Sequence, residues 1–128
     1  MTASRPYELT LHARPSSIGD ARRFFTDVAH RLDLSSEQAR LGELAVSELV
    51  TNAVVHAHGP ISVRVQRGAH GVRIEIGDCS PRTPRMGDPT VDRSDSHGLP
   101  IVAAVADEWG WDGDPDDTGK VVWFTLPG

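Results

Sequence analysis

Glu48-Leu49-Val50-Thr51-Asn52-Ala53 is a stretch of apolar helix interrupted by a carboxylate and a carboxamide. At helical spacing, the face that contains this stretch reads Leu41, Ala45, Glu48, Asn52 and Val55. Because a helix has about 3.6 residues per turn, Glu48 and Asn52 project from that face one turn apart. An unpaired polar group in a protein core costs about 1–3 kcal/mol, and an ionised carboxylate costs more. The stretch therefore predicts a cleft that contains water, a metal ion or a ligand.

The helix around this stretch has recognisable ends. Ser35 is followed three residues later by Gln38, which is the spacing of a capping box at a helix start. Gly59-Pro60 comes directly after the apolar pattern and stops the helix. The sequence therefore predicts one long helix that opens at Ser35 and ends before Gly59.

Two more elements precede this helix. Tyr7 to His12 alternates with period two and predicts a short strand, which follows a flexible tail over residues 1–6. Pro15-Ser16-Ser17 supplies cap residues for an amphipathic helix of about four turns. Its apolar positions are Ile18, Ala21, Phe24, Phe25, Val28, Ala29 and Leu32. Both helices are expected to bury one face.

The remaining elements complete a sheet. Ile61–Val65 and Val72–Ile76 alternate and predict an antiparallel hairpin. An irregular loop from Asp78 to His97 follows, and then an apolar helix from Gly98 to Ala106. The chain closes with a turn near Asp112 to Gly119 and a strand from Val121 to Leu126. Trp109 and Trp111 are expected to pack in the core and at its rim. This order predicts an α+β fold, a two-layer sandwich of a mixed, mostly antiparallel sheet with helices on one face.

The composition limits the classes of protein to consider. The 128 residues predict a single domain, and a net charge of −5 with scattered basic residues argues against a nucleic-acid partner. No apolar run approaches the ~20 residues that cross a membrane, and the N-terminus lacks a secretory signal pattern. The single Cys79 excludes an internal disulfide. We therefore expect a cytoplasmic protein without membrane contact, which leaves protein partners to consider.

Three separated segments predict one chemistry. The amide oxygen of Asn52 suits Mg²⁺, and Glu48 is placed to hold or deprotonate a hydroxyl near that metal. Asp78, at a strand end, is suited to accept a hydrogen bond from the amine of adenine. Gly98 opens a helix whose N–H groups face phosphate, so the loop between Asp78 and Gly98 would act as a lid. Taken alone, Glu48 and Asn52 would instead be a hydrogen-bonded pair within a helical layer.

These motifs resemble the ATP-binding fold of gyrase, Hsp90, histidine kinases and MutL, known as the GHKL superfamily. The closest resemblance is to its stand-alone anti-sigma-factor serine kinases. Glu48 to Ala53 is similar to the N-box of that family, and Asp78 to the aspartate of its first glycine box. Gly98 and Leu99 are similar to the second glycine box, and Thr125 to a threonine near the adenine aspartate.

The resemblance implies a function for each residue. Glu48 would be the catalytic base, Asn52 would hold Mg²⁺ and the cofactor ATP, and Asp78, Gly98, Leu99 and Thr125 would bind the nucleotide. The protein would be an anti-sigma factor and ATP-dependent serine/threonine kinase. It would sequester a sigma factor and phosphorylate an anti-anti-sigma protein in a bacterial partner-switching system. Family members also dimerise, and Tyr7 to Leu11 offers an edge strand for a homodimer.

Departures from the family pattern leave two other functions open. The first glycine box reads Asp78-Cys79-Ser80-Pro81-Arg82, without its two glycines, and Ser96 replaces a glycine of the second. The alternative is therefore a catalytically weakened binding module that regulates transcription by protein contact only. A catalytic fragment of a histidine kinase is the third reading, although the chain lacks a helix with a phosphoacceptor histidine.

Overall fold

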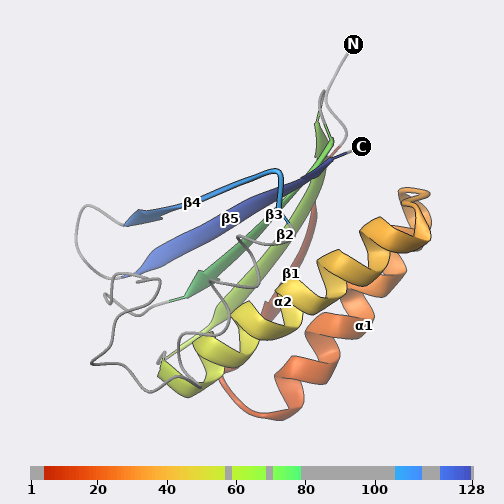
Figure 1. Cartoon of the computed structure of the whole chain (residues 1–128). Helices are drawn as coiled ribbons and strands as arrows, with labels where there is room; N and C mark the ends of the chain where they lie inside the picture. The colour runs from red at the N-terminus through yellow and green to blue at the C-terminus, as the bar shows by residue number, and fades with distance from the viewer. Residues whose placement is uncertain (1–4, 57–58, 69–70, 79–105, 114–118, 128) are drawn as a thin grey trace.

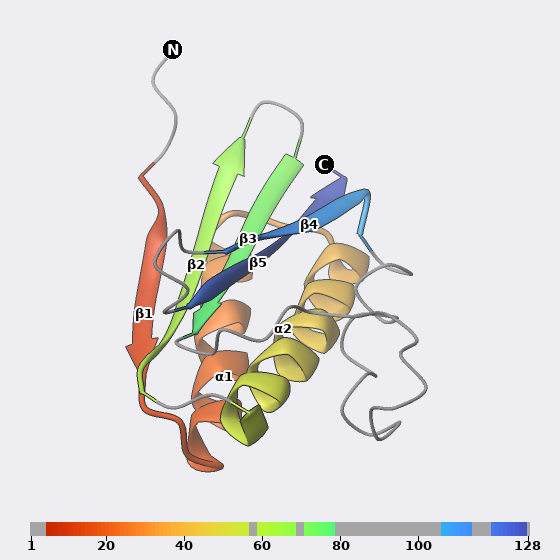
Figure 2. The same ribbon diagram turned by 90° about the vertical axis from the view of Figure 1, so that its left-hand side faces the viewer.

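The computed structural model describes residues 5–56, 59–68, 71–78, 106–113 and 119–127. Within these residues, two helices lie side by side on one face of a five-stranded sheet (Figures 1 and 2). This two-layer arrangement confirms the α+β prediction. Neither helix in the described part of the chain has the length and apolar character that crossing a bilayer requires.

The helices are α1 (Ser16–Arg31) and α2 (Ser36–His56). The capping box of α2 is confirmed, since the Gln38 N–H donates to Ser35 Oγ at 3.0 Å and the Ser35 N–H donates to Gln38 Oε1 at 2.8 Å. The prediction that Pro15-Ser16-Ser17 supplies the cap residues of α1 is confirmed for Pro15 only. The residue at its N-cap is Pro15, with no side-chain capping bond, and Ser17 Oγ donates to the carbonyl of His12 instead.

The sheet has the strand order β1-β2-β3-β5-β4, and every pairing is antiparallel. Its strands are β1 (Tyr7–Leu11), β2 (Ile61–Gly68), β3 (Gly71–Asp78), β4 (Glu108–Gly113) and β5 (Lys120–Pro127). The predicted hairpin is β2 and β3, and the predicted final strand is β5. Because β5 lies between β3 and β4, it becomes a central strand of the sheet.

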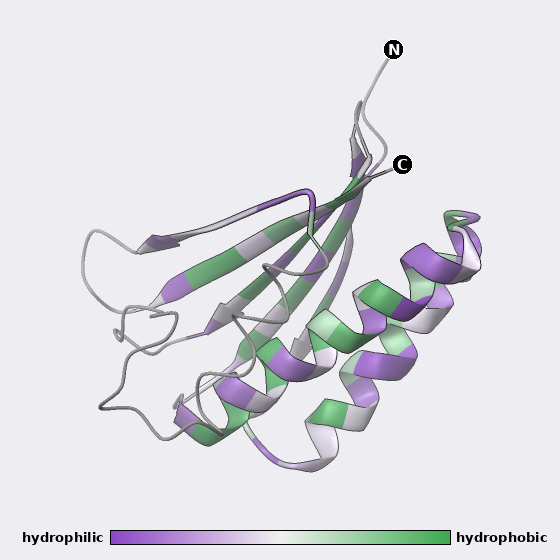
Figure 3. Cartoon of the chain, viewed as in Figure 1, coloured by the Kyte–Doolittle hydropathy of each residue, from purple (hydrophilic) through white to green (hydrophobic). Residues whose placement is uncertain are grey.

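The core lies between the helices and one face of the sheet. Along β3, Val72, Ile74 and Ile76 are buried against the helices, and the residues between them face the other way. Figure 3 shows the same alternation of apolar and polar positions along the strands. α1 packs over β1 and β2, whereas α2 packs over β2, β3 and β5. One face of the sheet therefore carries the core.

The strand β4 is absent from the sequence prediction. Its sequence, Glu-Trp-Gly-Trp-Asp-Gly, combines two tryptophans with residues that are depleted in strands. Trp109 packs against the core and Trp111 is 40% exposed, which agrees with the predicted core and rim packing. Of the predicted loop from Asp78 to His97, Asp78 is the last residue of β3. Residues 79–97 of that loop and residues 98–105 of the predicted third helix lie outside the described residues.

Candidate functional site

Glu48 and Asn52 lie on the side of α2 that faces away from α1. Glu43 marks the α1 side, because its carboxylate accepts from Arg22 of α1 at 3.1 Å. At 3.6 residues per turn, Asn52 projects about 180° from Glu43, and Glu48 lies within about 40° of Asn52. Both side chains are partly buried. They therefore lie at the boundary between the core and solvent, on the side of α2 toward β5 and β4.

Asp78 lies at the same end of the molecule as Asn52. α2 ends at His56, one turn after Asn52, and the chain enters β2 at Ile61. The first residues of β2 pair with the last residues of β3, as in the pair Ser62 and Gly77. The structure therefore brings the C-terminal turns of α2 and the carboxyl end of β3 to one end of the fold (Figure 1).

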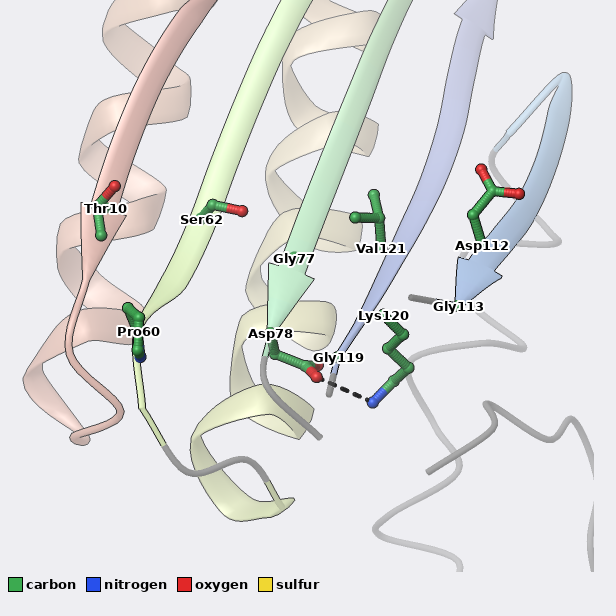
Figure 4. Close-up of a pocket in the computed structure, with 10 residues that line it drawn as sticks. All are labelled: Thr10, Pro60, Ser62, Gly77, Asp78, Asp112, Gly113, Gly119, Lys120 and Val121. Carbon is green, nitrogen blue, oxygen red and sulfur yellow. Dashed lines mark hydrogen bonds and ion pairs between the residues drawn. The ribbon is translucent and has the colours of Figure 1, made fainter. Parts of the chain in front are cut away.

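The carboxylate of Asp78 is nearly buried and forms an ion pair. Asp78 follows Ile76 at strand period two, so its side chain projects on the helix-facing side of the sheet. Lys120 stands directly opposite on β5, and its Nζ lies 3.2 Å from Asp78 Oδ1 (Figure 4). The side chains of Lys120 and Asp78 are only 13% and 7% exposed. The ammonium thus compensates a carboxylate that burial would otherwise destabilise.

Sequence reasoning missed Lys120, because only the strand register places it opposite Asp78. The signal that could have found it is the Gly119-Lys120 step, where the last alternating run begins. Trp111 is near this pair as well. A Cβ on Gly113, the β4 neighbour of Lys120, would lie 3.3 Å from the Trp111 ring, so the indole leans toward the same end of the sheet.

Thr125 does not join Asp78. Thr125 pairs with Arg73, five residues before Asp78 on β3, which is about 17 Å along the strand. Thr125 also follows Phe124, which is buried under the helices, so its side chain projects on the opposite face. There Thr125 Oγ1 accepts from the Glu108 N–H at 3.1 Å. In this structure the Thr125 side chain forms a hydrogen bond between β5 and the first residue of β4.

Two other predicted site residues, Gly98 and Leu99, lie outside the described residues, as do Ser80, Arg82 and Ser96. Within the described ranges, no group of three or more His, Cys, Asp and Glu side chains could hold a metal ion.

A cavity of about 570 Å³ lies at the same end of the sheet, on the face away from the helices (Figure 4). One row of paired residues crosses all five strands here: Thr10, Ser62, Gly77, Val121 and Asp112. Asp78 and Lys120 border the cavity at the strand ends, but Glu48 and Asn52 do not line it. The Asp78–Lys120 ion pair and the polar residues of α2 lie on the helix-facing side instead, which we take as the candidate site.

The comparison with known families agrees with this arrangement. The model of the histidine kinase-like ATPase domain matches residues 11–126, which include both helices and nearly all of the sheet. The chain belongs to this family. No curated protein matches the chain. The histidine kinase-like ATPase domain thus accounts for the two helices on one face of the sheet.

A solved structure shares this fold. It is the crystal structure of the RsbU and RsbW domains of Rv1364c from Mycobacterium tuberculosis, with a TM-score of 0.74 and 19% sequence identity. The match covers 97% of this chain and 32% of that chain. At this level of identity the likeness shows the fold alone.

Proposed function

We propose that this protein is an anti-sigma factor and an ATP-dependent serine/threonine kinase of a bacterial partner-switching system, acting in the cytoplasm. It would sequester a sigma factor and release it when an anti-anti-sigma protein binds. Phosphorylation of a hydroxyl on that anti-anti-sigma protein would reset the exchange. The observation that carries the proposal is the nearly buried Asp78 at the same end of the fold as Asn52, which shares a face of α2 with Glu48, in a histidine kinase-like ATPase domain.

The residues divide the work by their chemistry. Asp78 would accept a hydrogen bond from the adenine amine, since a carboxylate is an acceptor with two oxygens. Asn52 would hold Mg²⁺ with its amide oxygen, and the ion would neutralise phosphate charge when bound. Glu48, one turn earlier on α2, would orient the acceptor hydroxyl and take its proton. Gly98 and Leu99 would supply backbone N–H groups to phosphate oxygens.

Calorimetric titration with ATP and Mg²⁺ tests the nucleotide site. We expect saturable binding that Asn52→Ala weakens at least tenfold, because the ion loses its ligand from α2. Asp78→Asn should also weaken binding, since one acceptor oxygen becomes an amide donor. No binding at millimolar ATP by the unaltered protein would refute the kinase function.

A phosphotransfer assay with candidate anti-anti-sigma proteins tests the base. Glu48→Gln should retain ATP binding and lower the transfer rate by a factor of about 10²–10⁴, the usual contribution of a positioned base. Glu43→Gln is a matched control, because Glu43 lies on the same helix but pairs with Arg22 on the opposite side. Equal transfer rates for Glu48→Gln and the unaltered protein would exclude Glu48 as the base.

The second candidate function is a binding module without catalysis. It is favoured by the replacement of three family glycines with Ser80, Arg82 and Ser96, since glycine allows close approach of the backbone to phosphate. In this case the protein would inhibit its sigma factor equally well with Asn52→Ala and without ATP. Inhibition that requires ATP and fails in Asn52→Ala would exclude this function.

A further inference from the structure

Asp78 and Lys120 together place a hydrogen-bond acceptor and a hydrogen-bond donor at one end of the sheet. The two residues are direct cross-strand partners at the end of β3 and β5, and both project toward the helices. They therefore present a hydrogen-bond acceptor and a donor 3.2 Å apart, at the end of the sheet where α2 brings Asn52. Their positions are set by the sheet register rather than by a loop.

We infer that Lys120 reads the base of the nucleotide together with Asp78. This inference rests on the proposed nucleotide site. The edge of adenine offers an amino donor at N6 and, next to it, an acceptor at N1. In this arrangement the N6 amine donates a hydrogen bond to the Asp78 carboxylate. The Lys120 ammonium, which lies beside the same carboxylate, then donates a hydrogen bond to N1. Lys120 is thus a specificity-determining residue of this chain.

Stability alone is a weak account of this pair. Two charges that are almost withdrawn from water gain little over two apolar side chains of similar volume, because desolvation offsets their attraction. A carboxylate offers about four acceptor positions, so Asp78 can keep its bond to Lys120 while it accepts the adenine amine. Ligand binding therefore adds a hydrogen bond to the pair and leaves the ion pair intact.

The test compares the binding of ATP and 1-deaza-ATP, in which C–H replaces N1, by calorimetry on the full chain with Mg²⁺. The unaltered protein should bind 1-deaza-ATP at least tenfold more weakly, because the Lys120 ammonium loses its acceptor in a nearly dry site. In Lys120→Met, the ratio of the two affinities should fall to about one. Lys120→Arg keeps a donor and should retain part of the ratio, and 7-deaza-ATP, altered on another edge, is the ligand control.

The outcomes separate this inference from the proposed function. If the unaltered protein binds ATP and 1-deaza-ATP equally, Lys120 does not read N1 and the inference fails while nucleotide binding stands. If Lys120→Met weakens both ligands by the same factor, Lys120 acts only on structure, and the inference fails as well. If no ATP binds to the unaltered protein, both the function and the inference fail. The first comparison needs no variant and therefore holds even where Lys120→Met does not fold.

Discussion

Gly42 makes a close contact between α2 and α1. A Cβ at this position would lie 2.3 Å from Cζ of Phe25, whose side chain is fully buried. We therefore expect Gly42→Ala to lower the free energy of unfolding by about 1–3 kcal/mol, because the ring must move within a packed core. Urea denaturation followed by circular dichroism measures the change.

Gly19 of α1 is the matched control. A Cβ there would meet only the end of the Arg23 side chain, at 3.4 Å, which can move aside. Gly19→Ala should therefore gain up to about 1 kcal/mol from helix propensity. If both alanine variants change stability in the same direction, the steric account of Gly42 is wrong.

The candidate site was predictable at the residue scale only where the signal was local. Glu48 and Asn52 are four residues apart on one helix, so their common face follows from helical spacing alone. The neighbour of Asp78 depends on the register in which β3 and β5 pair. Neither strand sequence alone determines this register. For this reason Thr125 was placed near Asp78, whereas the sheet places Lys120 there.

At the scale of elements, the capping box of α2 determines where the site helix begins. Its reciprocal bonds join Ser35 and Gln38. Ser35→Ala should destabilise the protein by about 1 kcal/mol, the usual loss for a capping serine. Ser16→Ala at the start of α1 should change stability by less than about 0.5 kcal/mol, because that helix has no side-chain capping bond. Thermal unfolding of the two variants checks this expectation. Equal shifts of the melting temperature in both variants would contradict it.

The turn between the helices contains a residue in the left-handed conformation. Asp33 has φ 56° and follows the C-cap of α1, where the Leu34 N–H donates to the Ala29 carbonyl and the Asp33 N–H to that of His30. This is a Schellman motif, which favours glycine at the position of Asp33. We expect Asp33→Gly to stabilise the protein by about 1 kcal/mol, measured by urea denaturation. A loss of stability would show that the Asp33 side chain contributes to the turn.

The elements differ in how far the sequence predicts them. The hairpin of β2 and β3 and the helix α1 have strong periodicity, and α2 has clear signals at its two ends. The structure has all four elements close to the expected bounds. β4 has Gly110 and Gly113 in its six residues and gains its strand conformation from pairing with β5. Trp123 packs its ring over Gly110, where a Cβ would lie only 2.8 Å away. Such tertiary pairing leaves no local signal.

At the scale of the whole molecule, β1 is one edge of the described sheet and β4 is the other. We predict that two copies associate through β1, since an edge strand offers unpaired backbone groups. Light scattering at working concentration should give the mass of a dimer. Thr10→Lys on β1 should shift the mass toward the monomer, because an edge lysine blocks strand pairing.

The other edge provides the control for this experiment. Thr10 and Asp112 are the two ends of one row of paired residues across the sheet. Asp112→Lys places the same charge on β4 and should leave the mass of the dimer unchanged. A monomer in the unaltered protein, or equal dissociation in both variants, would rule out association through β1.

The central position of β5 has a consequence for synthesis in the cell. Ribosomes deliver a chain from its N-terminus, so β3 and β4 emerge before the strand that lies between them. Until residues 120–127 have left the exit tunnel, β4 has no neighbour among the described strands and Asp78 lacks its ammonium partner. A nascent chain paused earlier would expose apolar strand faces to chaperones. The site can therefore assemble only after residues 120–127 have left the ribosome.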